Sequence, residues 1–202
     1  MNMLRKPIVS FLGHVDSGKT SLQDFIRQST MVEREAGLIT QHIGASSVPI
    51  EAIKRICGDL LKGLKKGLTI PGLLFIDTPG HEAFTSLRKR GGSLADIAIL
   101  VVDINEGFKP QTVESVKILM DQKTPFIVAA NKLDLIPGWQ KVDGGILQEI
   151  NSQTESTRQD IDKKIYEILG SLSKTDITSE RFDRVDDYTK QVAIVPVSAK
   201  TG

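Results

Sequence analysis

Residues 13–20 read Gly-His-Val-Asp-Ser-Gly-Lys-Thr, in which two glycines bracket four residues and Lys-Thr follows. This spacing is that of a phosphate-binding loop. Gly13 and Gly18 allow a tight turn whose backbone N–H groups point at phosphate oxygens. Lys19 supplies a positive charge for the outer phosphates, and Thr20 offers a hydroxyl to Mg²⁺. We therefore expect this loop to bind a nucleoside phosphate with Mg²⁺.

The segments around the loop have the character that such a loop requires. Residues 8–12 are an apolar run typical of a buried strand, and residues 21–28 place three apolar side chains on one helical face. A helix that begins here directs its positive dipole end at the phosphates. The competing interpretation is a glycine-rich turn that binds nothing, and the strand–loop–helix order argues against it.

A second chemical motif follows the strand predicted at 71–76, where the chain reads Asp77-Thr78-Pro79-Gly80-His81. An acidic residue at the carboxyl end of a buried strand suits the second carboxylate of a magnesium site. Gly80 adds a backbone N–H near the expected terminal phosphate. The candidate phosphate-binding residues are Gly13, His14, Val15, Asp16, Ser17, Gly18, Lys19, Thr20 and Gly80.

The base is indicated by Asn-Lys-Leu-Asp at 131–134, directly after the strand predicted at 125–130. Asp134 can accept two hydrogen bonds from N1–H and the exocyclic amine of guanine, a donor pair that adenine lacks. Asn131 can bond the base edge and tie loops together, and the stem of Lys132 can cover the ring. After the strand at 192–197, Ala199 can present its N–H to the guanine carbonyl. The expected guanine-binding residues are Asn131, Lys132, Asp134, Ser198, Ala199 and Lys200.

Composition narrows the class of protein. The chain has 202 residues, 40% of them hydrophobic, and a net charge of +1, which is typical of one globular domain without a strongly basic surface. A single cysteine excludes an internal disulfide, and three histidines make a Cys/His metal site improbable. No apolar run has the length of a membrane span, and residues 1–7 contain no signal-peptide core. We expect a cytoplasmic protein that binds neither membranes nor DNA.

Strands alternate with helices along the chain, which predicts an α/β fold. The most apolar run, 97–102, is expected as a central strand buried on both faces. We predict a mostly parallel six-stranded sheet with helices on both faces. Helical insertions are expected near 50–65 and 146–190, and a polar loop at 29–48. Such sheets bind ligands at the carboxyl ends of their strands, where all the motifs above lie.

Taken together, the phosphate loop, Asp-Thr-Pro-Gly-His and Asn-Lys-x-Asp resemble those of translational GTPases, which are Ras-like G domains of the P-loop NTPase class. Residues 37–45 are similar to the first switch of the initiation factor two family. Residues 48–64 and 106–112 resemble its archaeal and eukaryotic branch, initiation factor five-B, with archaeal members the better match. One departure is Ser17, where bacterial members usually carry histidine.

The resemblance implies a GTPase that converts GTP to GDP and phosphate and promotes ribosomal subunit joining and initiator tRNA placement. Hydrolysis is expected to be stimulated by the large ribosomal subunit and coupled to release of the factor, with other initiation factors as further partners. Residues 1–202 are expected to form the G domain alone. Its usual last helix and the downstream domains that contact tRNA and ribosome would then lie beyond Gly202.

The resemblance also implies roles for the switch residues. Thr20 and Thr40 would bind Mg²⁺ directly, and Asp77 would reach the ion through water. His81 would orient the attacking water. In this family Thr40 binds the ion only when GTP is present.

Two further roles follow from the family alone. Val15 and Ile39 would form an apolar gate that restrains His81 until the ribosome engages. Asp16 would bind a monovalent cation, K⁺ or Na⁺, in place of an arginine finger.

Three alternatives remain open. The chain could belong to a translational GTPase of the elongation type, against which the switch sequence argues. It could be a GTP-responsive assembly module in which hydrolysis is incidental. A GTPase that acts away from the ribosome is disfavoured because His81, rather than glutamine, follows Asp-Thr-Pro-Gly.

Overall fold

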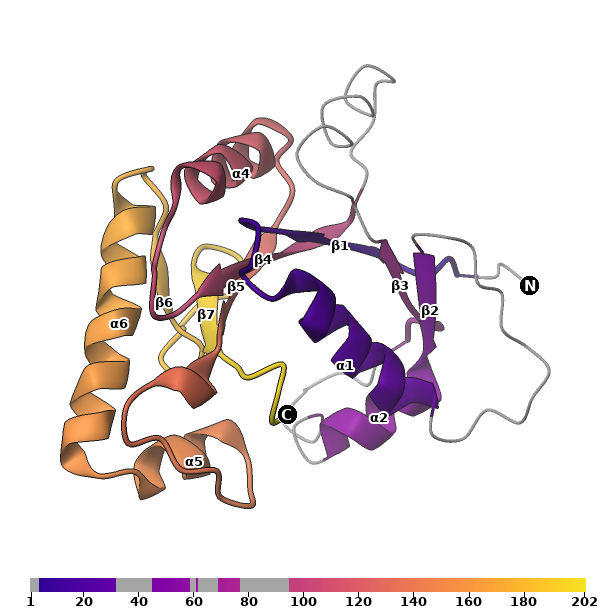
Figure 1. The fold of residues 1–202 in the computed structure, drawn as a ribbon. Helices are drawn as coiled ribbons and strands as arrows, with labels where there is room; N and C mark the ends of the chain where they lie inside the picture. The colour runs from indigo at the N-terminus through magenta and orange to yellow at the C-terminus, as the bar shows by residue number, and fades with distance from the viewer. Residues whose placement is uncertain (1–3, 32–44, 59–60, 62–68, 77–94) are drawn as a thin grey trace.

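The computed structural model describes residues 4–31, 45–58, 61, 69–76 and 95–202 (Figure 1). Its strands form one seven-stranded sheet in the order β2-β3-β1-β4-β5-β7-β6. The strands are β1 (Ile8–Leu12), β2 (Ala45–Pro49), β3 (Gly72–Ile76), β4 (Ile97–Asp103), β5 (Phe126–Asn131), β6 (Ser179–Arg181) and β7 (Val192–Pro196). Among the described strands only the β2–β3 pair is antiparallel, so the prediction of a mostly parallel sheet is confirmed.

Helices cover both faces of the sheet, as predicted (Figure 1). They are α1 (Lys19–Met31), α2 (Ile50–Cys57), α4 (Pro110–Asp121), α5 (Ile146–Ser152) and α6 (Glu155–Ser173), with a short 3₁₀ helix, η2, at Leu133–Leu135. Alternate residues of β4 enter two separate apolar clusters. Leu100 and Val102 pack with α4 and α6, whereas Val101 packs with residues of α1. This alternation follows from the two-residue period of a strand.

The described residues form seven strands where six were predicted, and only five of the six were assigned to residues in the sequence. The sequence patterns miss β2, which reads Ala-Ser-Ser-Val-Pro, and β6, which reads Ser-Glu-Arg. Both lie at the edges of the sheet, where pairing is by backbone hydrogen bonds and no apolar run is required. The predicted loop at 29–48 is therefore wrong at both ends, since α1 extends to Met31 and β2 begins at Ala45.

The helical insertion predicted near 146–190 is also only partly correct. Helix stops at Ser173, and β6 with a series of turns occupies the remainder. Nor is α6 peripheral, because four of its side chains are 0–2% exposed and belong to the main core: Ile161, Ile165, Ile168 and Leu172. The helix predicted near 50–65 appears as α2, with residues 59–60 and 62–65 outside the described part.

None of the helices in the described ranges combines the length and the apolar character that a membrane crossing requires.

An ion pair holds the amino ends of β1 and β4 together. The carboxylate of Asp96 accepts two hydrogen bonds from Arg5, at 2.6 and 2.5 Å, and one from the backbone N–H of Ile8 at 2.7 Å. The hydrogen bond from Arg5 is the main reason why the pKa of Asp96 falls from 3.8 to about 2. A carboxylate whose pKa is lower in the folded than in the unfolded state stabilises the fold at pH values above its unfolded-state pKa. This contribution disappears as the pH falls through the folded-state pKa.

We expect Asp96→Asn to change the acid limb of the stability profile. The contribution of Asp96 is lost between pH 3.8 and about 2, so the variant should lose less stability than the parent over that interval. Near pH 7 its melting temperature should be only slightly lower, because the ion pair is exposed. Circular dichroism melts at a series of pH values measure this, and superimposable acid limbs would contradict it.

The place of α6 in the core gives a second prediction. Ile168→Ala should lower the free energy of unfolding by about 2–5 kcal/mol, because it removes a side chain that is 0% exposed. The matched control is Tyr166→Ala in the same helix, where the side chain is 57% exposed and the loss should be about 0.5 kcal/mol. Urea denaturation distinguishes the two; equal losses would mean that α6 is not part of the core.

Candidate nucleotide-binding site

The loop at residues 13–18 joins β1 to α1, in the strand–loop–helix order that the sequence predicts. Two of its glycines are required by the structure. Gly13 has φ 141° and Gly18 has φ 88°, and an added Cβ would lie 2.1 Å from the Val101 carbonyl oxygen and 2.2 Å from Nδ2 of Asn131, respectively. The loop is thus pressed against β4 on one side and β5 on the other, which only glycine allows.

Lys19 curls back over this loop. Its ammonium donates hydrogen bonds to the carbonyl oxygens of Gly13 and His14, both at 2.7 Å. Ser17 is 2% exposed, and its hydroxyl has no hydrogen-bond partner among the described residues. That hydroxyl would lie 3.2 Å from a Cβ on Gly13, so it sits inside the loop. A lysine charge and a buried, unpartnered hydroxyl together fit an anionic group such as phosphate.

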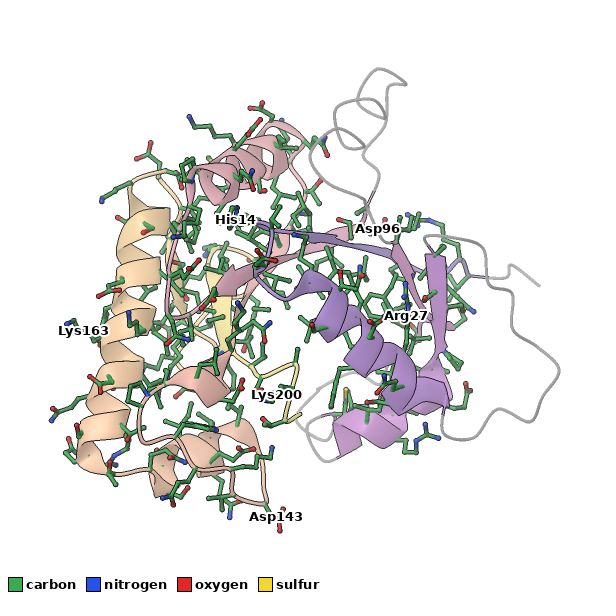
Figure 2. All side chains as sticks on the ribbon, in the orientation of Figure 1. His14, Arg27, Asp96, Asp143, Lys163 and Lys200 are labelled. Carbon is green, nitrogen blue, oxygen red and sulfur yellow. The ribbon has the colours of Figure 1, made fainter. Side chains whose placement is uncertain are left out.

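Two of the variable residues of the loop face outward. Val15 is 61% exposed, and Asp16 is exposed with φ 62°, in the left-handed region that non-glycine residues seldom adopt. His14 lies at the carboxyl end of β1, and its Nδ1 is 2.5 Å from Oε1 of Gln111 in α4 (Figure 2). This link between the loop and α4 is absent from the sequence-based prediction, because its two partners lie 97 positions apart.

Asn131 connects the phosphate loop to the last base loop. Its side chain is buried, at 2% exposure. Nδ2 donates to the Ser17 carbonyl at 3.0 Å, and Oδ1 accepts from the backbone N–H of Ala199 at 3.0 Å. The predicted tie between loops is therefore confirmed. The Ala199 N–H, expected at the guanine carbonyl, is here donated to Asn131, so a base contact would have to share this donor.

Asp134 lies in η2, and its Oδ1 accepts a hydrogen bond from the Ser198 hydroxyl at 2.7 Å. Ser198 Oγ in turn accepts from the backbone N–H groups of Lys200 and Thr201, at 3.3 and 3.1 Å. Lys200 itself is exposed (Figure 2). A carboxylate has about four acceptor positions, so Asp134 keeps the capacity for two further donors. This is the capacity that guanine recognition requires.

Lys132 has a carboxylate partner that the sequence reasoning missed. Its ammonium lies 2.8 Å from Oδ2 of Asp103, the last residue of β4. Burial works to raise the pKa of Asp103, but hydrogen bonds from Lys132 and from the Asn105 backbone prevail, and the pKa is lowered. The hydrogen bond to Asp103 raises the pKa of Lys132. The sequence does contain a feature that could have identified Asp103: it is an acidic residue at the end of an apolar strand, as Asp77 is.

The remaining candidate residues lie outside the described ranges. They are Ile39, Thr40, Asp77, Gly80 and His81. Of the expected magnesium ligands, only Thr20 is described, and it is exposed in the first turn of α1. An exposed hydroxyl beside the phosphate loop fits one oxygen ligand of Mg²⁺.

The described motifs converge at one edge of the sheet. β1, β4, β5 and β7 are adjacent and parallel, so their carboxyl ends lie together. The phosphate loop follows β1, Asp103 ends β4, Asn131 ends β5 and Ser198 follows β7. The expectation that the motifs would meet at the carboxyl ends of the strands is confirmed for the three predicted motifs that the structure describes, after β1, β5 and β7; the motif at 77–81 lies outside the described residues.

Known proteins are similar to this chain. A probable translation initiation factor IF-2 from Methanobrevibacter smithii is 58% identical over 200 residues, which are 98% of this chain and 34% of the relative. The crystal structure of GDP-bound aIF5B from Aeropyrum pernix matches with a TM-score of 0.90 and 52% identity, over 98% of this chain and 33% of that one. The chain thus spans about a third of the length of these relatives.

A more distant structure shares the fold alone. Translation elongation factor SelB from Methanococcus maripaludis, in its apo form, has a TM-score of 0.55 and 22% identity, over 100% of this chain and 31% of that one. The family model of the elongation factor Tu GTP-binding domain matches residues 5–202, nearly the whole chain. With the phosphate loop and the base loops joined at one sheet edge, the chain belongs to this family of translational GTPase domains.

Proposed function

We propose that the chain is the GTP-binding and GTP-hydrolysing domain of a translation initiation factor. The observation that carries this proposal is the Asn131 bridge, which joins a phosphate loop to a guanine loop through two 3.0 Å hydrogen bonds. Similarity at 58% identity to a probable initiation factor IF-2, and at 52% identity to aIF5B, supports initiation over elongation. SelB, at 22% identity, supports only the fold.

Guanine is held by Asp134, which accepts from N1–H and from the exocyclic amine. Ser198 fixes the orientation of this carboxylate by its 2.7 Å hydrogen bond. Adenine offers no such pair of donors and would leave a partly buried carboxylate without partners. Asn131 and the Ala199 N–H complete the base edge, Lys132 covers the ring, and Lys200 borders the pocket.

The phosphates are held by the backbone N–H groups of residues 13–18, by Lys19 and by the amino end of α1. Gly80 adds an N–H at the terminal phosphate. Thr20 and Thr40 would hold Mg²⁺ directly and Asp77 through water. When bound, this ion neutralises charge that develops on the phosphate oxygens.

Hydrolysis needs an oriented water more than covalent help. We assign this role to His81, with Val15 and Ile39 as the apolar gate that restrains it. Val15 is 61% exposed and therefore accessible to such a contact. Asp16 would hold a monovalent cation, K⁺ or Na⁺, beside the phosphates; its left-handed backbone projects it from the loop.

The whole protein would act in the cytoplasm, where it promotes ribosomal subunit joining and placement of the initiator tRNA. The large ribosomal subunit would stimulate hydrolysis, and hydrolysis would time release of the factor. Contacts to initiator tRNA and to other initiation factors would come from parts beyond this domain. This division is consistent with a chain that covers 34% of its IF-2 relative.

Asp134→Asn tests base recognition. We expect GTP affinity to fall about 100-fold, because the amide keeps one acceptor oxygen and one hydrogen bond to a charged acceptor, worth roughly 1.5–3 kcal/mol, is lost. Xanthosine triphosphate should bind better than to the parent, because an amide can donate to the xanthine carbonyl. Titration with fluorescent analogues of both nucleotides and of ATP measures this. A preference for ATP would overturn the base assignment.

His81→Ala tests hydrolysis. The variant should bind GTP as the parent does but lose at least about 100-fold of ribosome-stimulated turnover, the usual scale for a group that positions the reacting water. Single-turnover phosphate release with ribosomes, in the full-length factor, is the measurement. The control is Tyr166→Ala, which changes an exposed residue of α6 and should leave both GTP binding and turnover unchanged. Unchanged turnover in His81→Ala, or loss of GTP binding, would contradict the role.

A further inference from the structure

Lys132 is held at both ends. Its backbone has φ 68° and ψ 35°, a left-handed conformation that costs energy in a residue with a side chain. Its carbonyl oxygen accepts a hydrogen bond from Nδ2 of Asn105 at 3.2 Å, and its ammonium lies 2.8 Å from Asp103. The residues that hold this lysine thus come from the turn after β4.

That turn is itself well anchored. Asp103 pairs with Asn131 in the parallel register of β4 and β5, and the Ile104 N–H donates to the Asn131 carbonyl at 2.9 Å. The other carboxylate oxygen of Asp103 accepts the Asn105 N–H at 2.8 Å. From α6, Lys164 donates to the Asn105 carbonyl at 2.9 Å. Both oxygens of Asp103 are therefore used, and its side chain is 11% exposed.

Three carboxylates act on the Lys132 ammonium: Asp103 in direct contact, and Glu106 and Asp16 at longer range. All three raise the pKa of Lys132, so it is charged at neutral pH. Only Asp103 makes a close contact, and it lies beside Asn131 in the sheet. Without its charge, only the longer-range attraction of Glu106 and Asp16 would act on the ammonium.

We propose that Asp103 is a positioning residue of the guanine-nucleotide site: it fixes the Lys132 side chain in place before nucleotide binds. This inference rests on the proposed function of the Asn131–Asp134 loop. The long lysine side chain has many rotamers when free, and an ion pair built into the fold orders it in advance. The loss of side-chain entropy then does not weaken the free energy of nucleotide binding.

Asp103→Asn tests the proposal. The amide keeps the shape and can still accept the Asn105 N–H, but it removes the charge that holds Lys132. We expect the Kd for GDP and for GTP to rise about tenfold alike, mainly through faster dissociation. Titration and stopped-flow release of fluorescent GDP measure both quantities on the folded fraction, beside a thermal melt of the nucleotide-free chain.

The control is Asp96→Asn, which removes the carboxylate of the ion pair with Arg5 at the other end of β4 (Figure 2). It should lower stability slightly and leave the Kd for GDP unchanged. A role of Asp103 in stability alone would likewise shift the melt without changing the Kd of the folded protein.

A double-mutant cycle isolates the lysine. Lys132→Met should raise the Kd for GDP in the parent background. In the Asp103→Asn background, the ratio of the Kd with Lys132→Met to the Kd without it should be at least fivefold smaller. Equal ratios in the two backgrounds, or tighter GDP binding by Asp103→Asn, would overturn the positioning role. Failure of the unaltered chain to bind GDP or GTP would instead overturn the proposed function, so the two failures are distinguishable.

Discussion

The arrangement of the site depends on one buried amide. Asn131 donates to the Ser17 carbonyl, 114 positions away, and accepts from the Ala199 N–H, 68 positions away. A buried amide is costly unless its donor and acceptor both find partners, so this side chain favours the one placement of the two loops that satisfies it. Gly18 makes that placement sterically possible, because a Cβ there would lie 2.2 Å from the amide nitrogen.

Two lysines at this edge of the sheet, Lys19 and Lys132, are held by different kinds of partner. Lys19 donates to two backbone carbonyls, which carry no formal charge. Lys132 lies against the carboxylate of Asp103, which neutralises it. A base needs an ordered neighbour, and the ion pair with Asp103 orders the side chain of Lys132. The fold thus separates the lysine of the phosphate loop from the lysine of the base loop.

The sheet makes this separation possible. β4 lies at the centre of the strand order, and its residues are buried on both faces by two distinct clusters. Its neighbours β1 and β5 therefore cannot shift in register without moving side chains from one cluster to the other. The loops that follow β1 and β5 therefore keep a fixed position relative to each other. Helix α6 also packs on the sheet through its core side chains, and its Lys164 bonds the turn after β4.

The sequence by itself determined the chemistry of the loops and the central strands. The phosphate loop, Asn131 and Asp134 stand at fixed spacings within a few residues, and apolar runs such as 97–102 are local signals of burial. Only the tertiary structure decided which distant groups support them. Asp103 against Lys132 and Gln111 against His14 are contacts between separate strands and helices, and no spacing along the chain encodes them. The edge strands β2 and β6 were not predicted for a related reason. They pair with a neighbouring strand through backbone hydrogen bonds, which require no particular pattern of side chains.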